Sequence, residues 1–253
     1  MTESMSTQQQ KLFKILLLGD NCTDVYRFGT VDRISPEAPV PVFKFSHDES
    51  KPGMAGNVKL NLEALGCEVN FLHSESSTKT RLIDLRSRQH IVRIDNDIEC
   101  NPIGFETAIP NIYDAIVISD YNKGTVSYEL IEAIRDNTAV PIFIDTKKRD
   151  LARFEGCFIK INMHEYNQLV SQPSQIIVTA GDKGVLYNEE YIAGHKVEVV
   201  DVCGAGDTFL SALVYGYLNN DYNILKGIDF ANKAASVTVQ HLGNYAPTLE
   251  EIK

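Results

Sequence analysis

The sequence lacks the patterns that mark several common classes of protein. Its five cysteines are odd in number and include no C-x-x-C pair, and its six histidines show no H-x-x-x-H or similar spacing. The first absence argues against a disulfide framework and indicates a reduced, cytoplasmic protein. The second absence argues against a zinc site.

Positive charge and long apolar segments are also scarce. The net charge of −10 argues against nonspecific binding to nucleic acid or anionic membranes, although a few local Lys or Arg side chains can still bind an anionic small molecule. The longest apolar run near the start, ILLLG, is too short to cross a membrane. The first ten residues, MTESMSTQQQ, lack the apolar core of a signal peptide, so we expect a disordered tail at 1–10.

What the sequence does contain is a series of short apolar runs separated by helical patterns. The runs typical of buried parallel strands are KILLLGD, EVNFLH, AIVISD, PIFIDT, FIKIN and IIVTAG. Helical periodicity appears in AGNVKLNLEALG, in SYELIEAIRD and after Asp207. Strands that alternate with helices predict one α/β domain over residues 11–253, with a mostly parallel sheet between two helical layers.

One segment has a different character. VPVFKFS interleaves apolar residues with Pro and Lys and follows the proline-rich loop RISPEAP. This pattern is typical of an exposed strand, and the later RQHIVRID resembles it. We therefore predict a small β-flap, formed by residues from about 25–46 and 88–96, beside the main sheet.

Three of the expected parallel strands end in an acid, at Asp20, Asp120 and Asp145. Ligands of open α/β sheets bind outside the carboxyl ends of the strands, so the three acids favour a polar site there. A strand-end Asp can equally cap the turn that follows it.

The most informative motif is Gly204-Ala205-Gly206-Asp207, placed at the start of an apolar helical stripe. The usual phosphate-binding patterns G-x-x-x-x-G-K-[ST] and G-x-G-x-x-G are absent. Asp207 is either a first-turn acid stabilised by the helix dipole or a base for phosphoryl transfer. In the second interpretation, backbone N–H groups hold the transferred phosphoryl group while Asp207 accepts the proton of an alcohol. We expect the helix terminus to keep Asp207 ionised and therefore a weak base.

DVCGAGDTF closely resembles the D-x-x-G-A-G-D signature of the ribokinase-like sugar kinases, the phosphofructokinase-B (pfkB) family. PGMAGNVKLNLEALG is similar to the glycine-rich N-terminal signature of that family, NMHE to its N-x-x-E motif, and TAGDKG to its T-x-G-x-x-G motif. DFANKAAS resembles the late helix beside the adenine. The resemblance spans nearly the whole chain and implies a ribokinase-like three-layer α/β/α sandwich with a β-flap as lid.

A narrower resemblance is to the heptose 7-phosphate kinases of this family. It rests on GDNCTDVYRFGTVDRISPEAPVPVFKF, on TKTR, on SDYNKG and on the DTK after PIFI. It implies ATP- and Mg²⁺-dependent phosphorylation of the C1 hydroxyl of D-glycero-D-manno-heptose 7-phosphate, a step toward ADP-heptose and the lipopolysaccharide core. Because no H-x-G-H motif of a fused nucleotidyltransferase is present, we expect kinase activity only.

The resemblance also implies which residues bind the acceptor. Asp207 would be the base and Gly204, Ala205 and Gly206 the anion hole. The residues implied for the sugar and its phosphate are Asp20, Asp24, Gly53 and Asn57, then Arg33, Arg93, Asp120 and Lys123. Gly53 and Gly56 would equally permit a tight turn, and the three cations would equally be surface charges.

For the nucleotide side the resemblance implies Asn162, Glu165, Thr179, Gly181, Gly184 and Asn232. Glu165 would act on Mg²⁺ through water, or would simply be a first-turn acid. Asn232 would contact the nucleotide or cap a turn.

The sequence departs from the family pattern in two places. Met54 stands where the relatives carry a second glycine, and it either narrows the sugar pocket or points into the core. After residue 72 only a short SESS segment precedes Thr78, where the relatives insert a strand–helix unit. We therefore keep three interpretations open: a streamlined enzyme, a kinase for another sugar or sugar phosphate, and a non-catalytic binding protein. The exposed flap suggests a homodimer formed through the flaps.

Overall fold

The computed structural model describes residues 11–104 and 112–252. The predicted tail at 1–10 lies outside these residues. Within the described part of the chain, no helix is long and apolar enough to cross a membrane.

The main sheet is built from strands that are buried on both faces. In β1 (Lys14–Gly19), Ile15 and Leu17 pack into one apolar layer, whereas Leu16 and Leu18 pack into the other. Successive side chains of a strand point to opposite faces, so a strand between two helical layers needs apolar residues at every position. This explains why the sequence shows continuous apolar runs here instead of alternation.

All six predicted strands form in this sheet. Within the described residues it has eight strands in the order β12-β11-β10-β9-β8-β7-β1-β4, parallel except at the β10–β11–β12 edge. The remaining strands are β4 (Glu68–Leu72), β7 (Ala115–Asp120), β8 (Ile142–Thr146), β9 (Phe158–Asn162), β10 (Ile176–Thr179), β11 (Val185–Tyr187) and β12 (Glu190–Ile192).

Helices cover both faces of the main sheet. The helices are α1 (Ala55–Ala64), α2 (Tyr128–Asp136), α3 (Met163–Tyr166), α4 (Ala205–Asn219) and α5 (Ile224–Thr238), with short 3₁₀ turns at Leu151–Phe154 and Gly181–Lys183. The apolar residues of α1, α4 and α5 share one core layer, and those of α2 share the other. The predicted three-layer α/β/α sandwich is confirmed.

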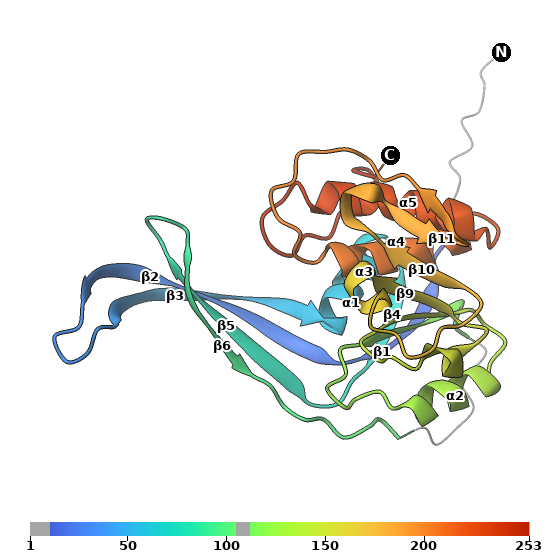
Figure 1. Ribbon diagram of the computed structural model, residues 1–253, viewed down its shortest axis with the longest axis horizontal. Coiled ribbons are helices and arrows are strands. Elements are labelled where there is room, and N and C mark those ends of the chain that lie inside the picture. The colour runs from blue at the N-terminus through green and yellow to red at the C-terminus, as the bar shows by residue number, and fades with distance from the viewer. Residues whose placement is uncertain (1–10, 105–111, 253) are drawn as a thin grey trace, which may run out of the picture.

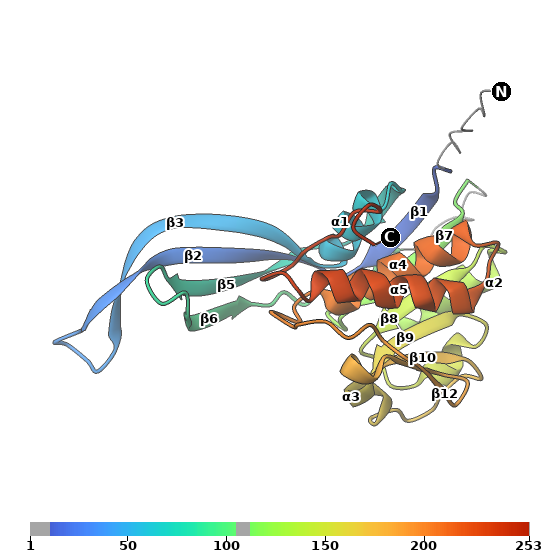
Figure 2. The ribbon, with the colours of Figure 1, turned by 90° about the horizontal axis from the view of Figure 1, so that it is seen from above.

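A second sheet, which we call the flap sheet, extends away from the main body (Figure 1, Figure 2). Its order is β3-β2-β5-β6, from β2 (Asn21–Ile34), β3 (Pro41–Met54), β5 (Ser76–Asp84) and β6 (His90–Asn96). It contains the flap segments expected from the sequence, but its β2–β3 hairpin is longer. It also includes β5, which pairs in parallel with β2 and was not expected there.

The link between the two sheets is short on one side. β4 is the edge strand of the main sheet, and residues 73–75 lead directly from it into β5 of the flap sheet. The predicted absence of a strand–helix unit after residue 72 therefore has a structural counterpart at this edge.

Candidate active site

The first turn of α4 begins at a residue in the left-handed region. Gly204 has φ of +75°, which favours glycine, and a Cβ at this position would lie 3.0 Å from Asn57 Nδ2. The helix then starts at Ala205, so the N–H groups of the Gly204–Gly206 turn lie at its positive end. Asp207 follows in the first turn.

The side chain of Asp207 is held from two directions. Asn57 Nδ2 donates to its Oδ2 at 2.8 Å, and the hydroxyl of Tyr121 donates to its Oδ1 at 3.0 Å. Asn57 comes from α1 and Tyr121 from the end of β7, while Asp207 itself is only 7% exposed. Three segments that are distant in the sequence thus fix one carboxylate.

The environment of Asp207 raises its pKa. Burial is the largest cause and brings the pKa to about 6, with Asp145 acting in the same direction; the hydrogen bonds from Asn57 and Tyr121 and the charge of Lys160 oppose the rise. The expectation of a weak base held by the helix terminus is therefore wrong. Loss of hydration outweighs the helix dipole and makes this carboxylate a stronger base than a free aspartate.

A buried ion pair lies beneath the turn. Lys160 Nζ on β9 contacts Asp145 Oδ2 on β8 at 2.6 Å, and both side chains are largely buried. A Cβ on Gly206 would lie 3.0 Å from the same Nζ. Burial alone would lower the pKa of Lys160, but Asp145 and Asp207 outweigh it and the pKa is raised. A permanent positive charge therefore stands directly behind the first turn of α4.

The other two strand-end acids are buried and hydrogen-bonded within the protein. Asp20 is 1% exposed, and its carboxylate accepts hydrogen bonds from the backbone N–H groups of Tyr121, Lys123 and Thr125. Asp120 is equally buried and bonds to Thr146 and Lys148. These two acids fix the loop after β7 and thereby position Tyr121. This agrees with the alternative that a strand-end Asp caps the turn that follows it.

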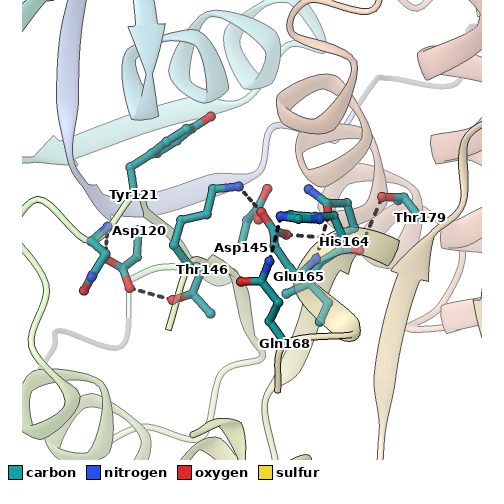
Figure 3. A network of polar contacts seen from close by, with 12 residues as sticks. Asp120, Tyr121, Asp145, Thr146, His164, Glu165, Gln168 and Thr179 are labelled. Atoms are coloured by element: carbon teal, nitrogen blue, oxygen red, sulfur yellow. Dashed lines mark hydrogen bonds and ion pairs between the residues drawn. The ribbon is translucent and has the colours of Figure 1, made fainter. Parts of the chain in front are cut away.

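Figure 3 shows how these roles separate. The side chains of Asp120 and Thr146 face each other, joined by a 2.6 Å hydrogen bond, while the ring of Tyr121 points away from them. The loop after β7 is thus anchored by one residue and presents the next.

Asp24 and Gly53 meet at the base of the flap sheet. A Cβ on Gly53 would overlap the carboxylate of Asp24, so only glycine allows this approach. The other oxygen of Asp24 accepts from Arg81 of β5 at 2.5 Å. Both of these predicted sugar contacts therefore lie on the wall that leads from the flap to Asn57.

Met54 occupies a backbone conformation suited to glycine. Its φ is +52° with ψ at −131°, and its side chain is buried. Met54 is buried at the point where β3 passes into α1, and it belongs to neither of the two apolar core layers.

A cavity of about 510 Å³ lies on the other side of the α4 turn. Ala205 and Gly206 close one end of it. Its lining includes the predicted nucleotide residues Thr179, Gly181, Gly184 and Asn232, together with His195, Lys196, Val197, Val199, Val202, Phe209 and Val239. Apolar walls, a few polar groups and a helix N-terminus at one end suit an aromatic base joined to phosphates.

Asn162 and Glu165 do not line this cavity. They form a capping box at the start of α3, in which Asn162 Oδ1 accepts from Glu165 N and Glu165 Oε2 accepts from Asn162 N, both at 2.9 Å. The remaining oxygen of Glu165 pairs with Lys147. Figure 3 shows Glu165 between Asp145 and the neighbouring His164 and Gln168.

A divalent metal has few protein ligands available. In residues 11–104 and 112–252, no group of three or more His, Cys, Asp or Glu side chains could hold a metal ion. Mg²⁺ commonly binds through one or two carboxylates plus substrate phosphates and water. Glu165 is compatible with that arrangement only if it releases Lys147.

The predicted cations are dispersed. Arg33 is exposed toward the end of β2, away from the base of the flap. Arg93 is also exposed and pairs with Asp95 on its own strand at 2.8 Å. Lys123 pairs with Asp97 at 2.6 Å. The structure brings none of the three to Asp207.

Sequence reasoning missed two residues that touch the centre of the site, Tyr121 and Lys160. Tyr121 lies within SDYNKG, a segment that was used only as a sign of resemblance. Lys160 lies inside FIKIN, an otherwise apolar run that was predicted to be a buried strand. Because Lys is rarely buried without a partner, this position was the available signal.

Comparisons with known proteins agree with this geometry. A family model described as "pfkB family carbohydrate kinase" matches residues 118–251, slightly more than half of the chain. The "Bifunctional protein HldE" of a Nitratiruptor species is 33% identical over 95% of this chain and 64% of the relative. The protein of the same name from Haemophilus influenzae (strain PittEE) is 30% identical over 96% and 63%. The chain thus spans less than two thirds of the length of these relatives.

The alignment with the Nitratiruptor protein is longer than the part of this chain that it covers. It extends over 299 positions, whereas 95% of this 253-residue chain is only about 240 residues, so about 60 positions have no counterpart here. This agrees with a shortened region in the present chain.

Solved structures resemble the fold at low sequence identity. Escherichia coli phosphofructokinase-2 has a TM-score of 0.70 at 14% identity, covering 95% of this chain and 97% of its own. Arabidopsis thaliana ribokinase, solved with ribose and ATP, has a TM-score of 0.69 at 14% identity, covering 96% and 98%.

Proposed function

The chain belongs to the pfkB family of carbohydrate kinases, and from this membership we propose that it transfers the γ-phosphoryl group of ATP to a sugar phosphate, D-glycero-D-manno-heptose 7-phosphate, at its C1 hydroxyl. The observation that carries the chemistry is the position of the first turn of α4. Ala205 and Gly206 of this turn line an apolar cavity, and the next residue, Asp207, carries the buried carboxylate. A donor nucleotide and an acceptor alcohol could meet there.

The proposed step uses groups of this chain at named atoms. The sugar oxygen attacks the γ-phosphorus, the bond to the β-phosphate oxygen breaks, and ADP leaves. The hydroxyl proton passes to Asp207, while the N–H groups of Gly204 to Gly206 donate to the oxygens of the phosphoryl group in transfer. Lys160, behind Gly206, adds fixed positive charge to that end of the helix.

The pKa of Asp207 suits this role. At about 6, it leaves the carboxylate mostly ionised at pH 7 and still basic enough to receive a proton as the phosphoryl group transfers. Tyr121 and Asn57 keep both oxygens in place, and each carboxylate oxygen can accept a further hydrogen bond.

Mg²⁺ would enter with the nucleotide, since the protein offers few ligands of its own. Mg²⁺ would supply charge neutralisation for the phosphates of the nucleotide. The residue in a position to orient it through water is Glu165, once the ion pair with Lys147 opens.

The choice of sugar rests on the relatives. Their shared name, "Bifunctional protein HldE", and about 30% identity over nearly the whole chain support a heptose kinase. A second candidate is a kinase for a different sugar phosphate, which is favoured by the about 60 aligned positions that have no counterpart in this chain and by the short SESS segment after residue 72.

A substrate panel with coupled detection of ADP separates these candidates. We expect turnover of heptose 7-phosphate to exceed that of ribose, fructose 6-phosphate and adenosine, with a 1,7-bisphosphate as product by ³¹P NMR. Faster turnover of one of the other acceptors would identify the second candidate. Nucleotide binding without ADP formation from any acceptor would contradict kinase activity altogether.

We also propose a homodimer formed through one face of the flap sheet. Cross-strand pairs place Val25, Thr80 and Ile94 on this face, with Leu82 beside Val92, and Val92 and Ile94 are about half exposed. A twofold contact covers the same face on both copies, which suits an apolar sheet face that lacks a cover. Sedimentation should give a dimer at micromolar concentration and a monomer for Ile94→Glu. A wild-type monomer would contradict the proposal.

A further inference from the structure

The face of the flap sheet opposite to Val25 and Ile94 is polar and carries a row of cations. β2 and β3 pair Asp24 with Lys51, and β2 and β5 pair Asp24 with Lys79 and Tyr26 with Arg81. Directly paired residues lie on the same face of a sheet. Four polar groups from three strands therefore surround the ring of Tyr26 or lie next to it.

Tyr26 is the centre of this group. Lys51 Nζ lies 5.9 Å and Arg81 Cζ 5.4 Å from the centre of its ring. Burial and the nearby Asp24 raise the pKa of Tyr26 to about 12, so its hydroxyl stays protonated. Among the hydrogen bonds of the described residues, none involves this hydroxyl. It remains a donor without an acceptor.

The cations have more positive charge than their neighbours neutralise. Arg81 is paired with Asp24, and its side chain is 15% exposed. Lys51 and Lys79 form no ion pair within the described residues, whereas Arg93, the cross-strand partner of Arg81 on the same face, is bonded to Asp95. Glu49, opposite Tyr26, is a further acid on this face, so four cations face three acids and one positive charge is in surplus. A multiply charged anion is its natural complement.

The cations lie on the wall that leads to the catalytic carboxylate. Lys51 precedes Gly53 on β3, and the chain continues through Met54 into α1, whose Asn57 donates to Asp207. At about 3.3 Å per residue, the four-residue step from Lys51 to Ala55 at the start of α1 spans at most roughly 13 Å. A sugar that reacts at one end and carries a phosphate at the other has a comparable length.

The same face closes against the loop after α5. A Cβ on Gly243 would lie 3.8 Å from Tyr26 Oη and 3.9 Å from Lys51 Nζ. Gly243 N donates to Asp201, at the start of the segment that leads into the Gly204 turn. The cations therefore face the active-site loops and not the proposed dimer face.

We propose that Tyr26, Lys51 and Arg81 form the binding site for the phosphate that the acceptor sugar already carries, at the end of the sugar opposite to the hydroxyl that reacts. This inference rests on the proposed function for the acceptor class. It differs from the sequence-based expectation, which named Arg33, Arg93, Asp120 and Lys123 for the sugar phosphate and its surroundings. Lys79, which precedes Arg81 on the same face of β5, adds a positive charge to this face and forms no ion pair within the described residues.

The test compares a phosphorylated and an unphosphorylated acceptor in matched variants. For Lys51→Met we expect the KM for heptose 7-phosphate to rise about 10-fold or more, because a charge-assisted contact is lost. The kcat, and the KM for the corresponding heptose without phosphate, should change little. Lys44→Met, the same change at an exposed position farther along β3, should leave both KM values unchanged.

Arg81 needs a conservative substitution. Removing its charge would leave Asp24 buried and unpaired, which destabilises a fold strongly. Arg81→Lys retains the charge but loses the forked donor geometry, so it should raise the KM for the phosphorylated acceptor while the melting temperature stays close to wild type. Tyr26→Phe should act in the same direction with a smaller effect.

The result that would overturn the site is also specific. If Arg33→Met raises the KM for heptose 7-phosphate and Lys51→Met does not, the phosphate binds elsewhere on the flap. If Lys51→Met raises the KM of the phosphorylated and the unphosphorylated acceptor equally, Lys51 acts only on the fold or on the reacting end of the sugar, and the proposed phosphate site is wrong.

Calorimetry separates failure of this inference from failure of the proposed function. Wild-type protein that binds heptose 7-phosphate without forming ADP, with binding lost in Lys51→Met, would support the anion site and contradict the kinase. Wild-type protein that forms ADP equally well with both acceptors would support the kinase and contradict the anion site. Absence of both binding and turnover would overturn both.

Discussion

The two sheets of this molecule differ in how completely their polar groups are satisfied. At the ends of the main-sheet strands, Asp20, Asp120 and Asp145 each have hydrogen-bond or ion-pair partners within the protein. On the flap sheet, Lys51 and the hydroxyl of Tyr26 lack such partners in the described residues, and Val92 and Ile94 are about half exposed on the other face. The polar groups at the ends of the main-sheet strands are satisfied within the protein, whereas the flap sheet has groups that the proposed ligand and the proposed second copy would contact.

This difference predicts how substitutions in the two sheets will behave. Changes around Asp207 should lower kcat for every acceptor, because the groups act on the reacting atoms. Changes on the flap should alter the KM of one acceptor class, or assembly, and leave kcat largely intact.

The largest effect should come from Asp207→Asn. We expect kcat to fall by about 10²–10⁴-fold, the contribution of a positioned base, while ATP affinity is nearly retained. Asp221→Asn, at an exposed acid after α4, is the matched control and should retain full activity. Wild-type turnover in Asp207→Asn would show that Asp207 is not the base, and the predicted difference between the two sheets would then be wrong.

The same substitution should make the protein more stable at neutral pH. Asp207 has a pKa raised from 3.8 to about 6 by burial, so its contribution to stability is fully present below pH 3.8 and is lost as the pH rises through 6. Asp207→Asn avoids that loss and should raise the free energy of unfolding at pH 7 by up to about 3 kcal/mol. Urea unfolding of the wild type and of Asp207→Asn at pH 7 and pH 4 checks this. If the two proteins differ in free energy of unfolding by the same amount at both pH values, the buried-carboxylate assignment is contradicted.

A smaller effect is expected for Tyr121→Phe. The substitution removes one hydrogen bond to the Asp207 carboxylate, so the pKa of Asp207 should rise further and activity at pH 7 should fall by about 10-fold. Raising the pH should restore part of the loss, which a purely structural defect would not allow. Kinetics at pH 7 and pH 8.5 provide the measurement.

The smallest effect is expected on the flap surface. Arg27 and Asp48 form an exposed ion pair at 2.8 Å between β2 and β3. Arg27→Gln should leave the melting temperature and kcat within experimental error, because exposed pairs contribute little. A marked loss of kcat would show that this part of the flap takes part in the reaction and would contradict the predicted difference between the two sheets.

Local sequence patterns were enough to predict most of the fold. The six apolar strands and the Gly204–Asp207 turn were predictable because strand burial and helix starts depend on neighbouring residues. β5 was missed because TKTR has no strand alternation of apolar residues, and its place beside β2 depends on the absence of a unit after residue 72.

The site was only partly predictable for a different reason. Tyr121 and Asp207 are 86 positions apart, and nothing in either local sequence specifies their hydrogen bond. The pairing of Asp24 with Lys51 likewise depends on the register of a long hairpin. Asp20 was assigned to the sugar pocket from its strand-end position, but that position also suits an anchor for the next loop, and its hydrogen bonds to three backbone N–H groups give it the anchoring role.

The central claim is that a buried carboxylate of raised pKa receives the proton of the acceptor alcohol. The most direct measurement is the pH dependence of kcat/KM for the wild type and for Lys160→Met. We predict an acidic limb with its midpoint near pH 6 in the wild type, because activity requires ionised Asp207, and a shift of that midpoint to higher pH in Lys160→Met, because the nearby positive charge is lost. A wild-type profile that is flat between pH 5 and 8, or an acidic limb that Lys160→Met leaves in place, would contradict the account.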